Sequence, residues 1–478
     1  MVNAQKITSN TSWYLLALVV QKLLSFVYFT LLARHLAPMY YGQYQLAINF
    51  AMMLSVLADF GLSAVLIRET AKKQIPEQKL FAQIFSWKII LAVLTIAVAF
   101  LANEIFYRSN AVHPLIYLTT LIVVIDGFTL LFYGFIRGQQ NLFFESIGTI
   151  IFQLIILSLG LTTMSYTRSV YPFIAVIMVA SLFNFFYSAA LLWRKYHLKL
   201  RWSFDRELNK TIFHITWPFA LSAVFAKVYA YIDGLLLEAA QGATQLGYYS
   251  VAYKVTFAFQ FIPLAFVAAL YPAFAHYWQN DKERLERTLV KALHYLAYIA
   301  WPLAFGIFSV APVFIATLYT KHYLESIVPL QILILSLPFL FMNFALSYFL
   351  NATDRQKKNT ANLGLTMLLN IILNIVLISL LSANGASLAS SLSTVFLFSL
   401  NLYAVTRVAK IRAKDWWPIA KTIVAAAIMA AVVYVLDSFS PWFVNIFIGI
   451  VVYFCLMVLF KNLSRAEWQF LRQALRRN

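Results

Sequence analysis

Long stretches of apolar residues recur along residues 13–460 of this chain. Many run for about 20 residues, enough for a helix rising 1.5 Å per residue to cross a hydrocarbon layer roughly 30 Å thick. Short polar segments with glycine, proline or charged residues separate them. The pattern predicts an all-α, polytopic membrane protein with about fourteen transmembrane helices.

The predicted helices follow from the hydropathy of each stretch and its flanking polar residues. The first stretch is too long for a signal-peptide core and is expected to be a retained span. We place the helices near residues 11–33, 41–67, 81–103, 114–136, 142–163, 170–193, 211–236, 246–274, 289–312, 324–350, 361–381, 386–406, 417–436 and 441–460.

Composition supports the membrane assignment. Of the 478 residues, 62% are hydrophobic and 12% are charged, against about 45–50% and 25% in soluble domains. The single cysteine, Cys455, excludes a disulfide framework and a cysteine metal site. No nucleophile triad or metal-ligand cluster stands out, so no catalytic residue and no cofactor are predicted, apart from a coupling Na⁺ or H⁺.

The net charge of +19 raises the possibility of a nucleic-acid partner. However, about four-fifths of the 37 Lys and Arg lie in alternate loops and at the termini, which is the positive-inside pattern. It predicts a multi-pass protein of the cytoplasmic membrane with both termini cytoplasmic, and it removes the case for nucleic acid. The basic segment 194–210 and the basic tail are expected to contact anionic membrane lipids.

An internal repeat is visible at an offset of about 205 residues. Six predicted spans separate the copies, so the repeats are parallel. The prediction is two six-helix lobes, residues 1–205 and 206–410, around a central cavity, followed by a helix pair and basic tail, residues 411–478. The matched positions are Lys22 with Lys227, Gly42 with Gly247, and Asn49 with Lys254.

Lysines inside the predicted spans are the main candidates for binding. A charge near the bilayer centre costs about 2.5–3.5 kcal/mol, so such residues normally face protein or a water-filled cavity. Lys22 and Lys227 fall near mid-span and Lys254 lies deeper than an interface position. Together with Lys88 and Asn49 they are the predicted substrate-binding residues. A cavity lined by lysines attracts an anion such as phosphate or pyrophosphate.

Three aspartates within spans are the candidates for coupling or gating: Asp59, Asp126 and Asp233. Asp233 follows Lys227 by six residues and is rotated about 120° from it on an ideal helix, so the two do not form a facing pair. For Asp59 and Lys88 an interfacial position, with the lysine stem snorkelling, stays open. For the mid-span charges the alternative is an internal salt bridge.

The run LLARHLAPMYYGQYQLAINFAMMLSVLADFGLSAVLIRETAKK resembles the start of polysaccharide and O-antigen flippases of the Wzx type, in the multidrug/oligosaccharidyl-lipid/polysaccharide (MOP) exporter superfamily. WPFALSAVFAKVYAYIDGLLL and LGYYSVAYKVTFAFQFIPLAF are similar to it in the second lobe. The resemblance implies two lobes around a cationic cavity and a polyprenyl-pyrophosphate-linked oligosaccharide as substrate, moved from the inner to the outer leaflet by alternating access. It implies pyrophosphate binding by Lys22, Lys227 and Lys254, with other polysaccharide assembly proteins as candidate partners.

Two alternatives stay open. A cation-coupled multidrug exporter of the same superfamily would use Asp126 or Asp233 for protons or sodium, although four intramembrane lysines disfavour cationic drugs. A membrane glycosyltransferase or polymerase of the same pathway would need reactive groups on a sizeable outer loop. The predicted outer loops are short and hold only Arg34, Arg108, Arg168 and Lys321 as basic residues, so a transporter and not an enzyme is expected.

Overall fold

The structure is a computed structural model that describes residues 4–108, 111–436 and 441–462. The described residues form helices and no strands, which confirms the all-helical prediction. The basic tail that we expected to contact lipid lies, from residue 463 on, outside the described residues. The chain divides into two compact units. Unit 1 comprises Met1–Lys254 with Leu363–Ala386, and unit 2 comprises Val255–Asn362 with Ser387–Asn478.

Unit 1 contains every residue that we predicted to bind substrate or to couple transport. Helix α9 (Ala243–Ala258) belongs to unit 1 as far as Lys254. The other helices are α1 (Ala4–His35), α2 (Pro38–Asp59), α3 (Leu62–Lys72), α4 (Glu77–Phe106), α5 (His113–Gly138), α6 (Phe143–Met164), α7 (Val170–Tyr196) and α8 (Arg206–Gln241).

Unit 2 contains the later helices, and α14 (Gln356–Thr406) contributes to both units. The backbone of α14 is non-helical at Ser382, where φ is 52° and ψ is −127°, so two helical limbs meet there. The remaining elements are α10 (Phe261–Asn280), α11 (Lys282–Tyr319), η1 (Lys321–Ser326), α12 (Ile327–Ile334), α13 (Leu337–Ala352), η2 (Ala413–Trp416), α15 (Trp417–Leu436) and α16 (Trp442–Leu459).

Helices lie over all the predicted spans, but fewer of them than predicted are long and apolar enough by themselves to cross a membrane. Within the described residues, ten helices are long and apolar enough to cross a membrane, or up to twelve if each bent pair is one span. One bent pair is α2 and α3, which meet at 43°. There Phe60 and Gly61 have φ of 45° and 77°, a left-handed backbone that stops α2 without interrupting the apolar run. The number fourteen and the two-lobe division stay predictions.

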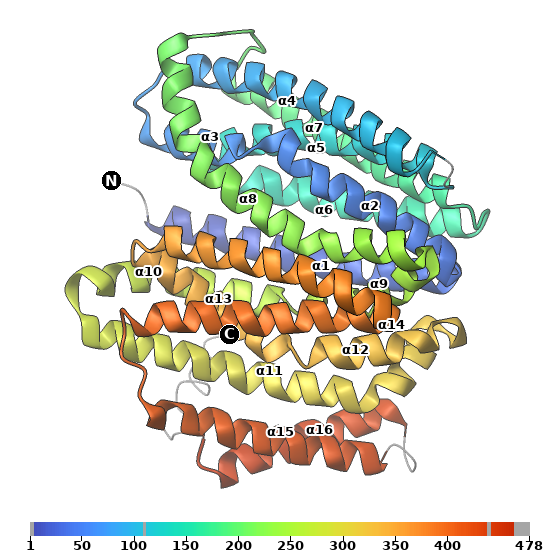
Figure 1. The fold of residues 1–478 in the computed structure, drawn as a ribbon. Coiled ribbons are helices and arrows are strands. Elements are labelled where there is room, and N and C mark those ends of the chain that lie inside the picture. The colour runs from blue at the N-terminus through green and yellow to red at the C-terminus, as the bar shows by residue number, and fades with distance from the viewer. Residues whose placement is uncertain (1–3, 109–110, 437–440, 463–478) are drawn as a thin grey trace. The chain divides into compact units, whose positions relative to one another are not determined.

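The packing of unit 1 centres on α5, which contacts α2, α3, α4 and α7 (Figure 1). Helix α2 also packs against α4 and α8, and α1 packs against α6. The core between α3, α4 and α5 is aromatic and aliphatic, and Phe81, Phe132 and Phe135 in it are almost completely buried. Helix α2 therefore lies among α4, α5 and α8 and can hold polar groups away from lipid.

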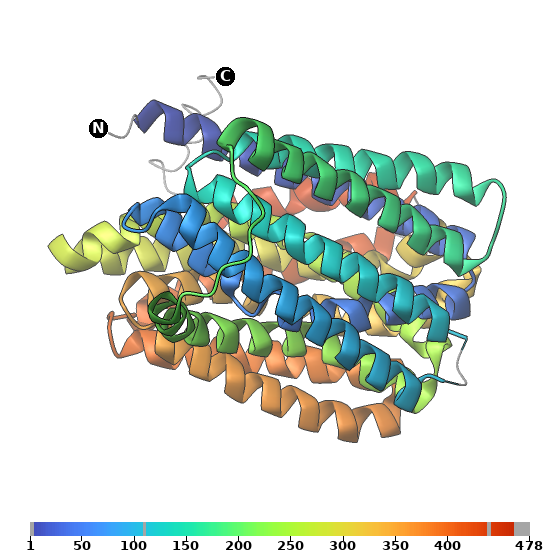
Figure 2. The ribbon, with the colours of Figure 1, turned by 90° about the horizontal axis from the view of Figure 1, so that it is seen from above.

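The start of α8 is fixed by the segment 197–205, which crosses one end of unit 1 (Figure 2). Asp205 caps α8 by accepting hydrogen bonds from the backbone N–H groups of Glu207 and Leu208, at 3.0 and 3.1 Å. Lys79 of α4 lies 2.7 Å from the Asp205 carboxylate and holds the pKa of that carboxyl below its ordinary value. Gln83 of α4 accepts a further bond from the Asp205 N–H at 2.8 Å.

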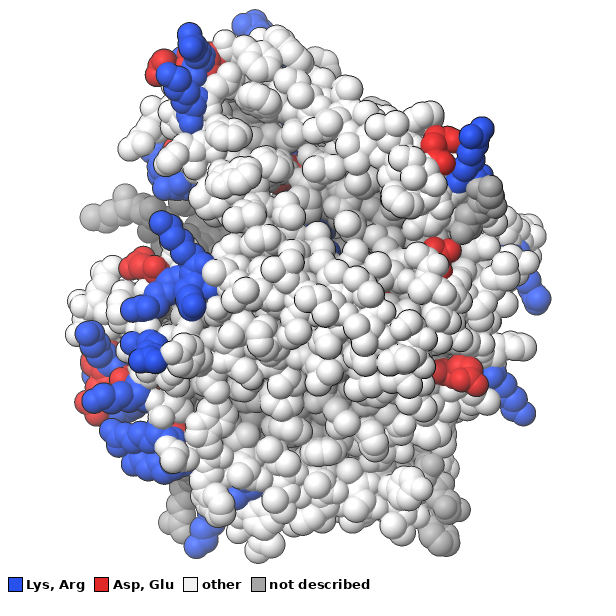
Figure 3. Space-filling view, viewed as in Figure 1, with Lys and Arg blue, Asp and Glu red and all other residues white. Residues whose placement is uncertain are grey.

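The charged side chains of each unit gather near the ends of its helices (Figure 3). In the view of Figure 3, an uncharged band separates those ends within each unit. This distribution is typical of helices whose middle parts face hydrocarbon, and it makes the charges inside unit 1 exceptional.

Candidate functional site

The repeat predicted from the sequence coincides with a reciprocal contact in unit 1. Helices α2 and α9 cross so closely at Gly42 and Gly247 that side chains are excluded. A Cβ on Gly42 would lie 1.7 Å from the carbonyl oxygen of Ala243, and a Cβ on Gly247 would lie 2.1 Å from the carbonyl oxygen of Pro38. Each glycine thus meets the residue four positions before the other, as two helices related by a twofold axis would.

A second pair of contacts has the same symmetry. Asn49 of α2 packs on Gly234 of α8, where a Cβ would meet the Asn49 Nδ2 atom at 2.3 Å. Lys254 of α9 packs on Phe29 of α1, with its Nζ 4.2 Å from the ring centroid. The offset that pairs Asn49 with Lys254 also pairs Phe29 with Gly234. The two copies therefore use equivalent contacts, but only the second places a cation there.

The structure brings two of the predicted lysines together. Lys22 lies near enough to Lys254 for their positive charges to repel one another. Lys254 is stabilised by the face of the Phe29 ring. Lys227 lies with its Nζ 5.4 Å from the centroid of the Tyr231 ring, and Asp59 is the carboxylate that attracts it.

Lys88 differs from the other three lysines because it is neutralised. Its Nζ lies 2.7 Å from Asp59 Oδ1, and its side chain is 1% exposed. Ser63 of α3 donates a hydrogen bond to the same oxygen. Gly127 of α5 lies beside the lysine, and a Cβ there would be in ordinary van der Waals contact with the Lys88 Nζ at 3.5 Å. The alternative in which Lys88 snorkels to the interface is therefore wrong, because its ammonium ends on a carboxylate inside the protein.

A cavity of about 220 Å³ lies between α2, α5 and α8 in unit 1. Asp59, Asp126 and Lys227 are its charged lining residues, and Met52, Val123 and Leu130 are among its apolar ones. The two carboxylates of this small cavity can hold a proton or a small cation, and its one ammonium can hold one end of an anion. Lys22 and Lys254 do not line it.

Asp233 has separate surroundings from Lys227, in line with the rotation expected along α8. It is 3% exposed and accepts hydrogen bonds from the Tyr249 hydroxyl at 2.9 Å and the Asn374 amide at 2.8 Å. The side-chain oxygens of Asn374 and Asn370 are buried without a hydrogen-bond partner among the described residues. Asn374 therefore meets the carboxylate through its NH₂ group, and Asp233 is the acceptor of a buried polar cluster with Tyr249 and Asn374. The described residues contain no group of three or more His, Cys, Asp or Glu arranged to hold a metal ion.

Sequence reasoning missed two kinds of site residue. Asn370 and Asn374 are neutral and fall within an apolar run, so no charge marked them, although a pair of buried asparagines four residues apart is itself a helical-face signal. Glu238 falls just beyond the predicted seventh span, where an acidic residue is expected to be solvated, yet it is only 7% exposed.

Two solved structures show which fold this is. The chain matches a structure of the lipid II flippase MurJ in an inward closed conformation with a TM-score of 0.79 and 18% identity, covering 95% of this chain and 99% of that one. It matches an inward-facing multidrug resistance MATE family transporter of the MOP superfamily with a TM-score of 0.68 and 14% identity, covering 82% and 98%. The fold is thus that of the MOP-superfamily membrane transporters.

The sequence comparisons identify the family. The model of the "Polysaccharide biosynthesis protein" family matches residues 7–278, and the MatE model matches residues 218–376. An uncharacterized membrane protein of Methanocaldococcus jannaschii, MJ1068, is 23% identical over 95% of both chains. The capsular polysaccharide biosynthesis protein CapF of Staphylococcus aureus is 21% identical over 80% of this chain and 95% of its own length. The chain belongs to the polysaccharide biosynthesis protein family, which confirms the resemblance seen in the sequence.

Proposed function

We propose that this protein is a flippase of the cytoplasmic membrane that moves a polyprenyl-pyrophosphate-linked oligosaccharide from the inner to the outer leaflet. The product would serve the assembly of a surface polysaccharide such as O-antigen, capsule or exopolysaccharide. The family match and the fold of the lipid II flippase support a transporter of lipid-linked precursors. Both termini would then be cytoplasmic, as the loop charges predict.

This proposal rests on a contrast among the four lysines, of which one forms an ion pair within the described residues and three do not. Lys88 is paired with Asp59 at 2.7 Å, whereas Lys22, Lys227 and Lys254 form no ion pair within 4.0 Å among the described residues. Placing charge in a membrane protein without a paired counterion is costly. An anionic ligand would repay that cost, and pyrophosphate is the anionic part of the proposed substrate. Lys22, Lys227 and Lys254 are therefore the proposed pyrophosphate ligands, and Lys88 positions Asp59.

The direct cellular test replaces Lys22 or Lys227 by alanine. We expect surface polysaccharide to be lost while the protein level in the membrane stays normal. Lys321, an exposed lysine of η1, gives the matched control, and Lys321→Ala should leave export unchanged. Normal export in both Lys22→Ala and Lys227→Ala would contradict the proposal that these lysines bind an anion.

Two carboxylates are the proposed coupling groups, and they suit different ions. Asp233 is a buried carboxylate in a polar cluster with Tyr249 and Asn374, and it is the proposed Na⁺ ligand. Asp126 opens onto the 220 Å³ cavity, where a proton can reach it. Sodium coupling through Asp233 predicts that Asp233→Asn removes the sodium dependence of transport in liposomes and that Asp126→Asn does not. The opposite result, with pH dependence lost in Asp126→Asn, would assign coupling to protons.

The second candidate is a cation-coupled multidrug exporter, and the match to the MatE model favours it specifically. Asp59 and Asp126, which both line the 220 Å³ cavity, would then hold the drug or its coupling ion. Binding of a fluorescent lipophilic cation that is lost in Asp126→Asn would support this candidate over the flippase. An enzymatic role has less support, because the structural relatives are transporters, and glycosidic bond formation by the purified protein would be needed to establish it.

A further inference from the structure

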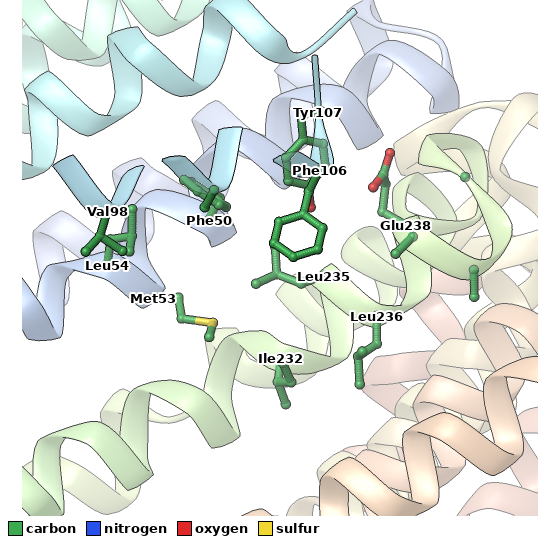
Figure 4. A pocket seen from close by; sticks show the side chains of 14 residues that line it. Phe50, Met53, Leu54, Val98, Phe106, Tyr107, Ile232, Leu235, Leu236 and Glu238 are labelled. Atoms are coloured by element: carbon green, nitrogen blue, oxygen red, sulfur yellow. The ribbon is translucent and has the colours of Figure 1, made fainter. Parts of the chain in front are cut away.

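A large apolar cleft lies between α2, α4 and α8 of unit 1, and it shares no lining residue with the cavity of Asp59, Asp126 and Lys227 (Figure 4). Its volume is about 840 Å³. Each of the three helices contributes apolar side chains to it. Examples are Leu54 from α2, Val98 from α4 and Ile232 from α8.

The cleft continues into a second hollow that is polar. This hollow, of about 590 Å³, shares Phe106, Glu238 and Gly242 with the cleft and adds Gln43 and Arg108 to its lining. Figure 4 shows Glu238 at the opposite end of the apolar cleft from Val98 and Leu54. The combined depression is therefore amphipathic along its length, apolar at one end and charged at the other.

The charged end contains one group of each sign. Glu238 is 7% exposed, so its carboxylate is held largely out of solvent at the wall of the hollow. The Arg108 side chain is 80% exposed and lies 3.7 Å from Glu104, so it keeps donors available to a ligand. Anion and cation at the mouth of an apolar cleft are complementary to a zwitterion with a hydrocarbon tail.

We propose that this depression binds a phospholipid with a primary-amine headgroup. The acyl chain occupies the cleft between α2, α4 and α8, the ammonium contacts Glu238, and the phosphate faces Arg108. The lining of the cleft is almost entirely apolar, which suits an acyl chain. A carboxylate at the wall of the hollow is an acceptor for a charge-assisted hydrogen bond from a primary ammonium. A pyrophosphate headgroup would instead meet the negative charge of Glu238, which disfavours the transported lipid as the occupant.

The test measures which lipids stay bound to the purified full-length protein, by native mass spectrometry after incubation with vesicles of defined composition. Three lipids are compared: phosphatidylethanolamine, phosphatidylcholine, whose trimethylated ammonium cannot donate a hydrogen bond, and anionic phosphatidylglycerol. We expect selective retention of phosphatidylethanolamine. Glu238→Gln should weaken it about tenfold, since charge-assisted hydrogen bonds are the strong ones and tenfold corresponds to one such bond. Glu207→Gln, on the same helix but outside the depression, should have no effect.

A second pair of variants tests the cleft itself. Ala102 lines the cleft on α4, whereas Ala97 on the same helix is exposed away from it. Ala102→Trp should abolish retention by filling the cleft, and Ala97→Trp should not. Monodisperse elution and an unchanged melting temperature establish that each variant is folded.

Three results would overturn the proposal. Equal retention of phosphatidylcholine, or unchanged retention in Glu238→Gln, would remove the headgroup assignment. Unchanged retention in Ala102→Trp would place the lipid elsewhere. If the protein retained a polyprenyl pyrophosphate preferentially, and Ala102→Trp abolished that retention, the transported substrate and not a phospholipid would occupy the cleft. None of these depends on flippase activity, so the proposed function is tested separately.

Discussion

The two copies of the repeat, α1 with α2 and α8 with α9, share their backbone contacts and differ in their charges. Gly42 and Gly247 pack reciprocally, and Asn49 meets Gly234 as Lys254 meets Phe29. The charged residues, in contrast, are not the same in the two copies. The first copy carries Asp59, for which the same offset gives Leu264 in the second.

This difference shows which properties of a repeat depend on packing and which on the ligand. Close helix crossings tolerate only glycine, so both copies keep it at equivalent positions. Charged groups are costly in a membrane and occur only where they have a partner or a ligand. In the first copy Asp59 is neutralised by Lys88 of α4, and Lys22 forms no ion pair within 4.0 Å among the described residues. In the second copy neither Lys227 nor Lys254 forms one with any of these residues.

The largest expected effect on stability comes from breaking the ion pair of the first copy. Asp59→Ala leaves the Lys88 ammonium 1% exposed and unneutralised, and such a change destabilises by about 3 kcal/mol. Thermal unfolding in detergent measures it. The double variant Asp59→Ala with Lys88→Met should recover most of the loss, because both charges are then absent. Equal destabilisation in the single and double variants would contradict a role for charge.

The glycine crossing tests whether the copies are structurally equivalent. Gly42→Ala and Gly247→Ala should each destabilise by about 2 kcal/mol, because either Cβ overlaps a carbonyl oxygen and the helices must move apart. Gly306→Ala is the control, since its Cβ would meet only the methyl end of Met429 at 3.5 Å. A lower melting temperature in one of the two variants alone would break the equivalence.

The smallest effect concerns the position where the copies differ in charge. Lys254→Asn gives the second copy the residue of the first and should slow transport about tenfold, the equivalent of one lost interaction with an anion. Asn49→Ala should slow it only about twofold, because Asn49 contributes a neutral polar contact. Initial rates in liposomes compare them. A larger effect at Asn49 would assign the first copy a greater share of substrate binding.

Much of this arrangement follows from the sequence, because hydropathy marks the helices and charge marks the exceptions within them. The offset between Lys22 and Lys227 led to Gly42 and Gly247, which do meet. One helix break was not accessible. The left-handed residue Phe60 ends α2 inside the predicted span 41–67, where hydropathy does not change. The break at Ser382, by contrast, falls between the predicted helices 361–381 and 386–406.

The sequence also does not show which side chains on different helices contact one another. Lys88 and Asp59 lie 29 positions apart, and Asp233 and Asn374 lie 141 apart. Helical periodicity places a residue on a face of its own helix, but it does not say which helix that face meets. Glu238 was overlooked for a related reason, since the cleft that it lines is formed together with residues of α2 and α4.

We propose that unpaired lysines of both copies bind the pyrophosphate of a lipid-linked oligosaccharide during its movement across the membrane. The most direct measurement is transbilayer movement of a labelled polyprenyl-pyrophosphate oligosaccharide in liposomes that contain the purified protein. We predict rapid movement with the native chain, none above protein-free liposomes with Lys22→Ala or Lys227→Ala, and native rates with Lys321→Ala. Movement at the native rate in both of the first two variants would contradict the claim.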